Sequence, residues 1–330
     1  MKKIIVLFMM VLLITTGCSK EITGKNPAGG MSDEPASQNP PQINRAEEAK
    51  PGITAVTREN YPKIDGSTST LRIVQALYRH FIDGGGPNFP EHASKTVPSY
   101  RLLIDGDADL IIVPYASLDV LNEAKAKNVE LQFYPVAAEA LIFITPVENE
   151  ADKITREQVR SIYLDNAIKN WQEIGGPNKD LVPICRNSNS GSQSQLDNLV
   201  LENKSMHPAI KRNYVELTME GLLEQVAFYH GGGLSGKPTN SYALGYTLYT
   251  YLQNMNNVTG IGEHLKILAY DDVKPTVETI ADGTYPLADA YYAVVRSDLP
   301  AAHSAWTLLE WLNGDEGAKA IEGLGLISMK

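Results

Sequence analysis

From residue 53 onward, short runs of apolar residues alternate with segments whose apolar residues recur at helical spacing. The runs at 110–113 and 141–144 are apolar throughout, which is typical of buried strands. The segments 71–82 and 118–127 carry apolar residues at the spacing of one helix face. This alternation predicts an α/β fold with mixed, mostly parallel sheets flanked by helices.

Capping residues locate further elements. Gly106 is expected to end a helix that begins at Thr96. Thr155 and Gln158 form a Thr-x-x-Gln capping box, which is expected to open another helix that runs to about residue 164. The other elements that the patterns predict are strands at 131–137, 182–185, 243–249, 266–270 and 291–295, and helices at 218–229, at 301–322 and from about Ser192.

The first residues have the pattern of a signal peptide. Two lysines precede an apolar stretch at 4–14, which is too short to span a bilayer. Small residues then lead to Cys18, in an order that resembles a bacterial lipobox. We therefore expect 1–17 to be a lipoprotein signal peptide and Cys18 to carry the lipid. The alternative is an ordinary signal peptide with an incidental cysteine.

The next segment, 18–51, is rich in Ser, Pro, Gly, Asn, Glu and Lys and has almost no large apolar residue. This composition predicts a disordered tether between the lipid and the folded part. No later stretch is long and apolar enough to cross a membrane, so we expect the folded part to lie outside the cytoplasm. Besides Cys18 the chain has only Cys185, so its fold must be held by its core without an internal disulfide.

The net charge of -10 argues against nucleic acid or an acidic surface as a partner. It does not argue against a small anion, because an anion site at helix N-termini acts locally. None of the six histidines is paired at metal-ligand spacing, so we expect no metal and no cofactor.

Three segments place small hydroxyl residues or glycine where a helix is expected to begin: 65–70, 95–96 and 186–192. The first turn of a helix leaves N–H groups unbonded and carries positive potential, so such an end binds phosphate-like groups. Arg186 adds a full charge and a planar fork of donors for two oxygens. Each segment alone is more simply a helix cap. Together, and with the arginine, they indicate an oxyanion site.

Asp109 enters the apolar strand at 110–113. A carboxylate there can accept a hydrogen bond from a protonated oxyanion. Phosphate keeps a proton at neutral pH and sulfate does not, so such an acceptor would reject sulfate. The other interpretation is that Asp109 only caps a loop.

With these segments the chain resembles the phosphate-binding proteins of bacterial phosphate ABC importers, a branch of the type II periplasmic-binding fold. The resemblance covers nearly all of 53–330. The matching stretches, in order along the chain, are 61–68, 95–96, 102–109, 162–163, 170–171, 175–176, 190–193, 244–246, 275–276 and 285–287.

The resemblance implies a ligand role for residues of all three segments and for Asp109, which would accept the ligand's proton. Many relatives carry an Asp two residues after the arginine, and this chain has Ser188 there, which leaves Arg186 less neutralised. The implied phosphate ligands are Ser67, Thr68, Ser69, Thr96, Asp109, Arg186, Ser190, Gly191 and Ser192.

The resemblance also implies two lobes that close on the anion by hinge motion. The chain would cross between them near 138–144 and 284–292. Of two positions open to Glu139, in the cleft or in a salt bridge at the hinge, we expect the salt bridge. The implied boundaries are 52–140 with 287–330 for lobe I, and 141–286 for lobe II.

The function implied is that of a monomeric, extracytoplasmic lipoprotein at the outer face of the cell membrane or in the periplasm. It would capture inorganic phosphate between the lobes and deliver it to an ABC transporter permease. One alternative is transport or sensing of another oxyanion, such as sulfate, molybdate or a phosphorylated metabolite. A secreted serine hydrolase using Ser190 or Ser192 is a remote alternative, because the chain lacks the Gly-x-Ser-x-Gly elbow and a histidine partner. We therefore expect no enzymatic activity.

Overall fold

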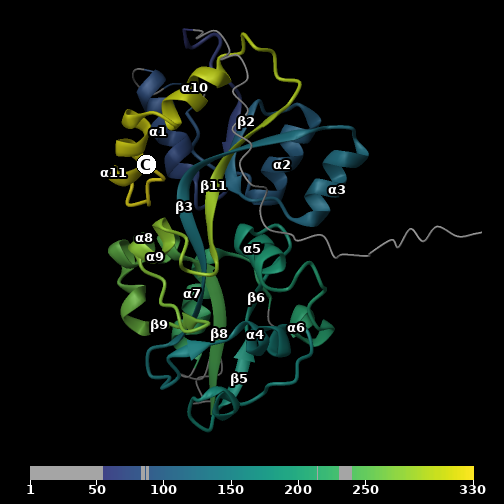
Figure 1. Cartoon of the computed structure of the whole chain (residues 1–330), viewed down its shortest axis with the longest axis vertical. Coiled ribbons are helices and arrows are strands. Elements are labelled where there is room, and N and C mark those ends of the chain that lie inside the picture. The colour runs from purple at the N-terminus through teal and green to yellow at the C-terminus, as the bar shows by residue number, and fades with distance from the viewer. Residues whose placement is uncertain (1–54, 83–85, 87–88, 214, 230–239) are drawn as a thin grey trace, which may run out of the picture. The chain divides into compact units, whose positions relative to one another are not determined.

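One mixed sheet of seven strands runs through the computed structural model (Figure 1), which describes residues 55–82, 86, 89–213, 215–229 and 240–330. These residues all belong to one compact unit, Ala46–Lys330. The strand order is β1-β2-β11-β3-β8-β5, with β9 paired to β3. The strands are β1 (Ile64–Gly66), β2 (Leu110–Pro114), β3 (Leu131–Pro146), β5 (Asp180–Pro183), β8 (Ser241–Leu248), β9 (Leu265–Ile267) and β11 (Ala288–Arg296).

The predicted signal peptide (1–17), the lipidation site Cys18 and the predicted tether (18–51) lie outside the described residues. Within the part of the chain that the structure describes, no helix combines the length and the apolar character needed to cross a membrane.

The strands β3 and β11 form the centre of the sheet. They pair antiparallel from Leu131 opposite Arg296 to Ala140 opposite Ala288, and β3 then continues alongside β8 and β9. Figure 1 shows them crossing together between two groups of elements. The mixed sheet is confirmed, but its central pairings are antiparallel, because β3 leads out of the first group and β11 returns. The parallel pairings, β1 with β2 and β5 with β8, lie at the two ends.

Several predicted elements have different extents in the structure. The strand expected at 182–185 is divided between strands at 180–183 and 185–186, and the one expected at 266–270 between strands at 265–267 and 269–270. The strands expected at 131–137 and 141–144 are one continuous strand, since the chain stays extended through the small residues and Glu139 between them. The helix expected at 301–322 is two helices, which are separated at Asn313 and Gly314.

Six of the helices that the structure describes begin within one residue of a predicted position, whereas those at 208–213, 249–259 and 277–281 were not predicted. The following helices flank the sheet. They are α1 (Leu71–Phe81), α2 (Thr96–Asp105), α3 (Leu118–Ala126), α4 (Arg156–Tyr163), α5 (Gly191–Leu199), α6 (Pro208–Asn213), α7 (Met219–Phe228), α8 (Tyr249–Thr259), α9 (Val277–Ala281), α10 (Ala305–Leu312) and α11 (Asp315–Gly323), with the short 3-10 helices η1 (Trp171–Ile174) and η4 (Ile261–His264). Two small ladders pair β4 (Lys153–Ile154) with β10 (Ala269–Tyr270), and β6 (Cys185–Arg186) with β7 (Val215–Glu216).

Buried apolar side chains form one large cluster and two smaller ones. The large cluster draws on residues between 138 and 287, together with Ile327. The smaller clusters draw on residues between 73 and 137 and between 291 and 326, with two residues from β8 and α7 added. Two separate groups of cores are what two lobes would need. The lobe boundaries stated above stay a prediction.

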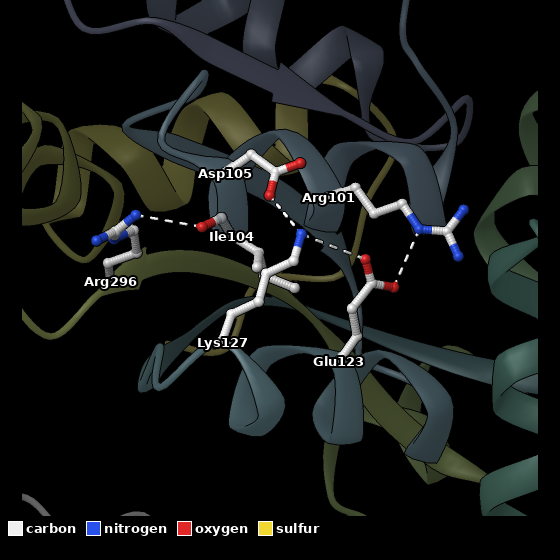
Figure 2. A network of polar contacts seen from close by, with 6 residues as sticks. All are labelled: Arg101, Ile104, Asp105, Glu123, Lys127 and Arg296. Atoms are coloured by element: carbon white, nitrogen blue, oxygen red, sulfur yellow. Dashed lines mark hydrogen bonds and ion pairs between the residues drawn. The ribbon is translucent and has the colours of Figure 1, made fainter.

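The C-terminal end of α2 is fixed by its cap and by its neighbours. At its C-terminus Gly106 has φ 80°, and its N–H donates to the carbonyl of Leu103 at 3.2 Å, as expected for a left-handed cap. Figure 2 shows Arg296 of β11 donating to the carbonyl of Ile104 at 3.2 Å. Exposed ion pairs add a weaker connection to α3; they join Arg101 to Glu123, and Lys127 to Asp105 and Glu123.

Replacing Gly106 with Ala should lower the free energy of unfolding by about 1 kcal/mol, because a Cβ is disfavoured at positive φ. Gly323→Ala is the matched control: it lies at the end of α11 with open space around it and no positive φ. That variant should be neutral or slightly stabilised. Urea unfolding followed by circular dichroism measures both, and equal losses would contradict the role assigned to the cap.

Candidate functional site

A cavity of about 240 Å³ opens where the N-terminal ends of several helices meet. It lies beyond the carboxyl ends of β1 and β2, the edge of an α/β sheet at which ligands usually bind. The residues that line it are Ser67, Thr68, Ser69, Lys95, Thr96, Arg186, Asn189, Ser190, Gly191, Ser192, Leu217, Thr218, Met219, Glu220, Leu248 and Tyr251. Every predicted ligand except Asp109 is among them.

The segment between β1 and α1 brings the first hydroxyl groups to the cavity. Ser67 is buried, and its N–H donates to the carbonyl of Ile112 on β2 at 3.2 Å. Its hydroxyl lies 3.0 Å from those of Ser69 and Thr70. The hydroxyl of Thr70 donates to the carbonyl of Ile112 and does not cap α1. The segment is therefore held against β2 while the N-terminus of α1 has no side-chain cap.

Lys95 precedes α2 and has an unusual backbone conformation, with φ 79° and ψ 168°. This region is almost restricted to glycine and costs a side-chain-bearing residue about 1–3 kcal/mol. Lys95 gives α2 no side-chain cap, and it borders the cavity beside Thr96. Strained residues of this kind gather at ligand sites, which makes Lys95 a candidate that the sequence analysis did not include among the ligands.

The N-terminus of α5 meets that of α2 directly. A Cβ on Gly191 would lie 2.7 Å from Oγ1 of Thr96 and 2.6 Å from Cγ of Pro114, so only glycine allows this approach. Ser190 gives α5 no side-chain cap; its hydroxyl lies 3.0 Å from that of Ser192. Three helices, α1, α2 and α5, thus present N-termini without side-chain caps to one cavity.

Arg186 supplies the buried positive charge of the site. It is 7% exposed, and its Nε and Nη2 donate to the backbone carbonyls of Glu216 at 3.2 Å and Leu217 at 3.4 Å. Burial lowers the pKa of Arg186, while Tyr246 and Glu216 nearby oppose that shift. Among the described residues no carboxylate forms an ion pair with it. Carbonyl dipoles orient this cation without neutralising it, which suits it to an anionic ligand.

The structure corrects the prediction for Asp109. Its carboxylate accepts a hydrogen bond from the N–H of Lys63 at 2.7 Å, and it does not border the cavity. The physical reason is the direction of β2: Asp109 precedes this strand, and the cavity lies beyond its other end. The five residues of β2 span about 16 Å. Asp109 therefore caps a loop, which was the other interpretation.

The hinge salt bridge predicted for Glu139 is also absent from the described residues. Its buried carboxylate accepts hydrogen bonds from the N–H groups of Ala140 at 2.9 Å and Thr250 at 3.0 Å, and from the hydroxyl of Thr250. Burial raises the pKa of Glu139, and these hydrogen bonds oppose the shift. Glu139 thus joins β3 to the first turn of α8.

A second cavity, of about 430 Å³, lies on the other side of Arg186. It contains Ser188, the position where many relatives carry Asp, so this serine does not border the first cavity. It also contains Asp197 of α5, which accepts a hydrogen bond from Nε2 of Gln193 at 2.9 Å. Burial raises the pKa of Asp197 to about 6.

Sequence reasoning missed the contribution of α7 and α8 to the first cavity. Thr218 caps α7 by accepting from the N–H of Gly221 at 2.9 Å, and it borders the cavity together with Glu220. Tyr251 of α8 completes this wall. Thr218 lies at the start of a predicted helix, as the hydroxyl residues of the three predicted segments do, so it could have been recognised in the same way. Nothing in the sequence indicated that this helix faces Arg186.

Lys95→Gly should raise the free energy of unfolding by about 1 kcal/mol, because glycine adopts the observed conformation without strain. Lys95→Ala removes the same charge and keeps the strain, so its stability should stay near that of the wild type. Urea unfolding of the two variants in anion-free buffer makes the comparison. If both variants changed equally, the strain would be refuted.

Asp197→Asn should change stability in a pH-dependent way. Because the pKa of Asp197 is higher in the folded chain, its ionisation disfavours folding. This penalty is absent below pH 3.8, grows as the pH rises to about 6, and then stays near 3 kcal/mol. The variant should therefore gain stability relative to the wild type between pH 4 and pH 7.5, as measured by urea unfolding. If the difference in unfolding free energy between the variant and the wild type were the same at pH 4 and pH 7.5, the raised pKa of Asp197 would be refuted.

Comparison with known proteins places this chain in a family. Residues 37–316 match the model of the PBP superfamily domain. The phosphate-binding protein PstS of Borreliella burgdorferi is 27% identical over 194 residues, which are 59% of this chain and 64% of that relative. The chain thus spans less than two thirds of that relative's length.

Two solved structures share the fold. An ABC-type phosphate transport receptor from Vibrio cholerae superposes with a TM-score of 0.59 at 20% identity, covering 81% of this chain and 99% of that one. A putative phosphate ABC transporter substrate-binding protein with bound phosphate from Clostridium perfringens gives 0.60 at 18% identity, covering 82% and 99%. The predicted resemblance and fold class are confirmed, and the chain belongs to the periplasmic-binding-protein (PBP) superfamily.

Proposed function

We propose that this chain is an extracytoplasmic solute-binding protein that holds inorganic phosphate in the first cavity and delivers it to an ABC importer. One observation carries the proposal: three helix N-termini without side-chain caps share a cavity with a buried arginine that has no carboxylate partner among the described residues. The relatives named as phosphate-binding proteins support the same ligand.

Each group at the cavity would have a separate task in binding. The hydroxyl groups of Ser67 and Thr96 would donate to the anion from one side, and those of Ser190 and Ser192 from the other. Arg186 would hold two oxygens with its planar fork. The aligned dipoles of α1, α2 and α5 add positive potential, so the negative net charge of the chain does not prevent binding.

The proposal includes two lobes, with lobe I formed by 52–140 and 287–330 and lobe II by 141–286. The donors come from both, so an anion between them would favour the closed arrangement over an open one. The strands β3 and β11 would act as the hinge because both cross between the groups of cores. Glu139 lies at this crossing and would keep β3 and α8 together during closure.

We further propose that the chain is a monomer anchored to the membrane by a lipid on Cys18, with 18–51 as a tether to an ABC permease. A catalytic role finds no support at the cavity. The hydroxyls of Ser190 and Ser192 lie 3.0 Å from each other, and no histidine is among the described residues that line it. The serine hydrolase alternative therefore lacks its base.

Another oxyanion, such as sulfate or molybdate, is the second candidate. It is favoured by the position of Asp109, because the proposed anion ligands include no carboxylate that only a protonated anion could satisfy. Glu220 is the only acidic residue among the described residues that line the cavity, and it is exposed. Calorimetric titration with phosphate and with sulfate at equal ionic strength distinguishes the two candidates.

Arg186→Ala should weaken phosphate binding at least 100-fold, because two hydrogen bonds from a charged donor are worth about 3 kcal/mol or more. Arg101→Ala is the matched control: Arg101 is an exposed arginine on α2 that pairs only with Glu123 in the described part of the chain. It should bind phosphate as the wild type does. Isothermal titration calorimetry measures both. Equal affinities in the two variants would place the site elsewhere.

A further inference from the structure

The residues proposed to hold the anion line only part of the first cavity. The rest is lined by Leu217, Thr218, Met219, Glu220, Leu248 and Tyr251, and Lys95 and Asn189 also border the cavity. We call this second part the annex. Its side chains come from the segment before α7, from α7 itself, and from the end of β8 with the start of α8.

The cavity is larger than an inorganic phosphate ion needs. Its volume of about 240 Å³ is many times the roughly 10–15 Å³ that a cavity needs to hold one water molecule. A phosphate ion has five heavy atoms, which on that scale need roughly 50–75 Å³. Most of the cavity would thus remain beside a bound phosphate ion.

This space does not come from separation of the anion ligands. The N-termini of α2 and α5 already touch: Gly191 packs against Thr96 and Pro114, and the N–H of Val97 donates to the carbonyl of Asn189 at 3.5 Å. The N-termini of α2 and α5 therefore cannot approach each other further. The annex therefore belongs to an arrangement in which the anion ligands are already together.

The walls of the annex suit an organic group. Leu248 and Met219 are buried, and Leu217 presents an apolar side chain that is 62% exposed. A bare oxyanion gains nothing from such walls, whereas an apolar substituent gains about 25 cal/mol for each Å² removed from water. Tyr251 adds an aromatic side chain to the lining of the cavity. Burial and Glu220 raise its pKa to about 12, so its hydroxyl is neutral at pH 7.

The anion ligands also tolerate a substituted oxygen. A carboxylate facing the substituted oxygen would disfavour an ester, because that oxygen carries no proton to donate. Asp109 is bonded to Lys63, and the carboxylate of Glu216 accepts from the N–H groups of Leu217 at 2.8 Å and Thr218 at 3.2 Å. Neither of these carboxylates borders the cavity.

We infer that the first cavity binds phosphate esters and phosphonates that carry a small apolar or aromatic group, with the phosphoryl group beside Arg186 and the organic group in the annex. This inference rests on the proposed function, since it uses the same phosphoryl site. It extends the ligand class from inorganic phosphate to its organic derivatives.

Isothermal titration calorimetry of the full chain with inorganic phosphate and with phenylphosphonate tests the inference. Phenylphosphonate should bind at least as tightly as inorganic phosphate. Leu217→Ser should weaken phenylphosphonate binding roughly 3- to 10-fold, by loss of apolar contact, and should affect inorganic phosphate much less, because the backbone carbonyl that holds Arg186 is kept. Val258→Ser, at an 83% exposed position of α8 outside the cavity, is the matched control and should change neither.

The outcomes separate the inference from the proposed function. If inorganic phosphate binds and phenylphosphonate binds 100-fold more weakly or not at all, the inference is overturned and the proposed function stands. If Leu217→Ser weakens both ligands equally, the assignment of the annex is overturned. If neither ligand binds, both the inference and the proposed function fail.

Discussion

The guanidinium of Arg186 is the charge on which the site depends. Burying a cation is costly unless charge and hydrogen bonds compensate it. Here the backbone carbonyls of Glu216 and Leu217 orient two of its nitrogens without cancelling the charge. The helix N-termini around it are positive as well, so the cavity combines positive groups that repel one another until an anion binds. Such a site binds an anion in strong preference to a neutral ligand.

The sheet explains how these positive groups come together. Parallel β1 and β2 end at the same edge, which places the segment at 67–70 and the N-terminus of α2 side by side. The crossing strands β3 and β11 carry the chain to the second group of elements, where α5 follows β6. Gly191 and Lys95 are the two positions at which the backbone itself is specialised for this contact, one by lacking a side chain and one by its strained conformation.

Local features of the sequence predicted much of this arrangement. The limits of α2, its glycine cap and the capping box at Thr155 follow from short-range rules, and the structure has all three. The grouping of the ligand segments came from the same rules together with the resemblance. The ligand role predicted for Asp109 was wrong, because a sequence motif does not show at which end of its strand the ligand lies. The salt bridge predicted for Glu139 was wrong, because the residue that it contacts, Thr250, is far away in the sequence. The annex was not foreseen for the same reason, since Leu217 and Tyr251 meet the site only through the fold.

A crystal structure of the chain grown with inorganic phosphate tests the central claim most directly. The account predicts one phosphate ion within hydrogen-bond distance of the Arg186 guanidinium, with the N-termini of α1, α2 and α5 directed at its oxygens. A phosphate ion bound elsewhere with high occupancy, while Arg186 keeps contacts only to protein and solvent, would contradict it.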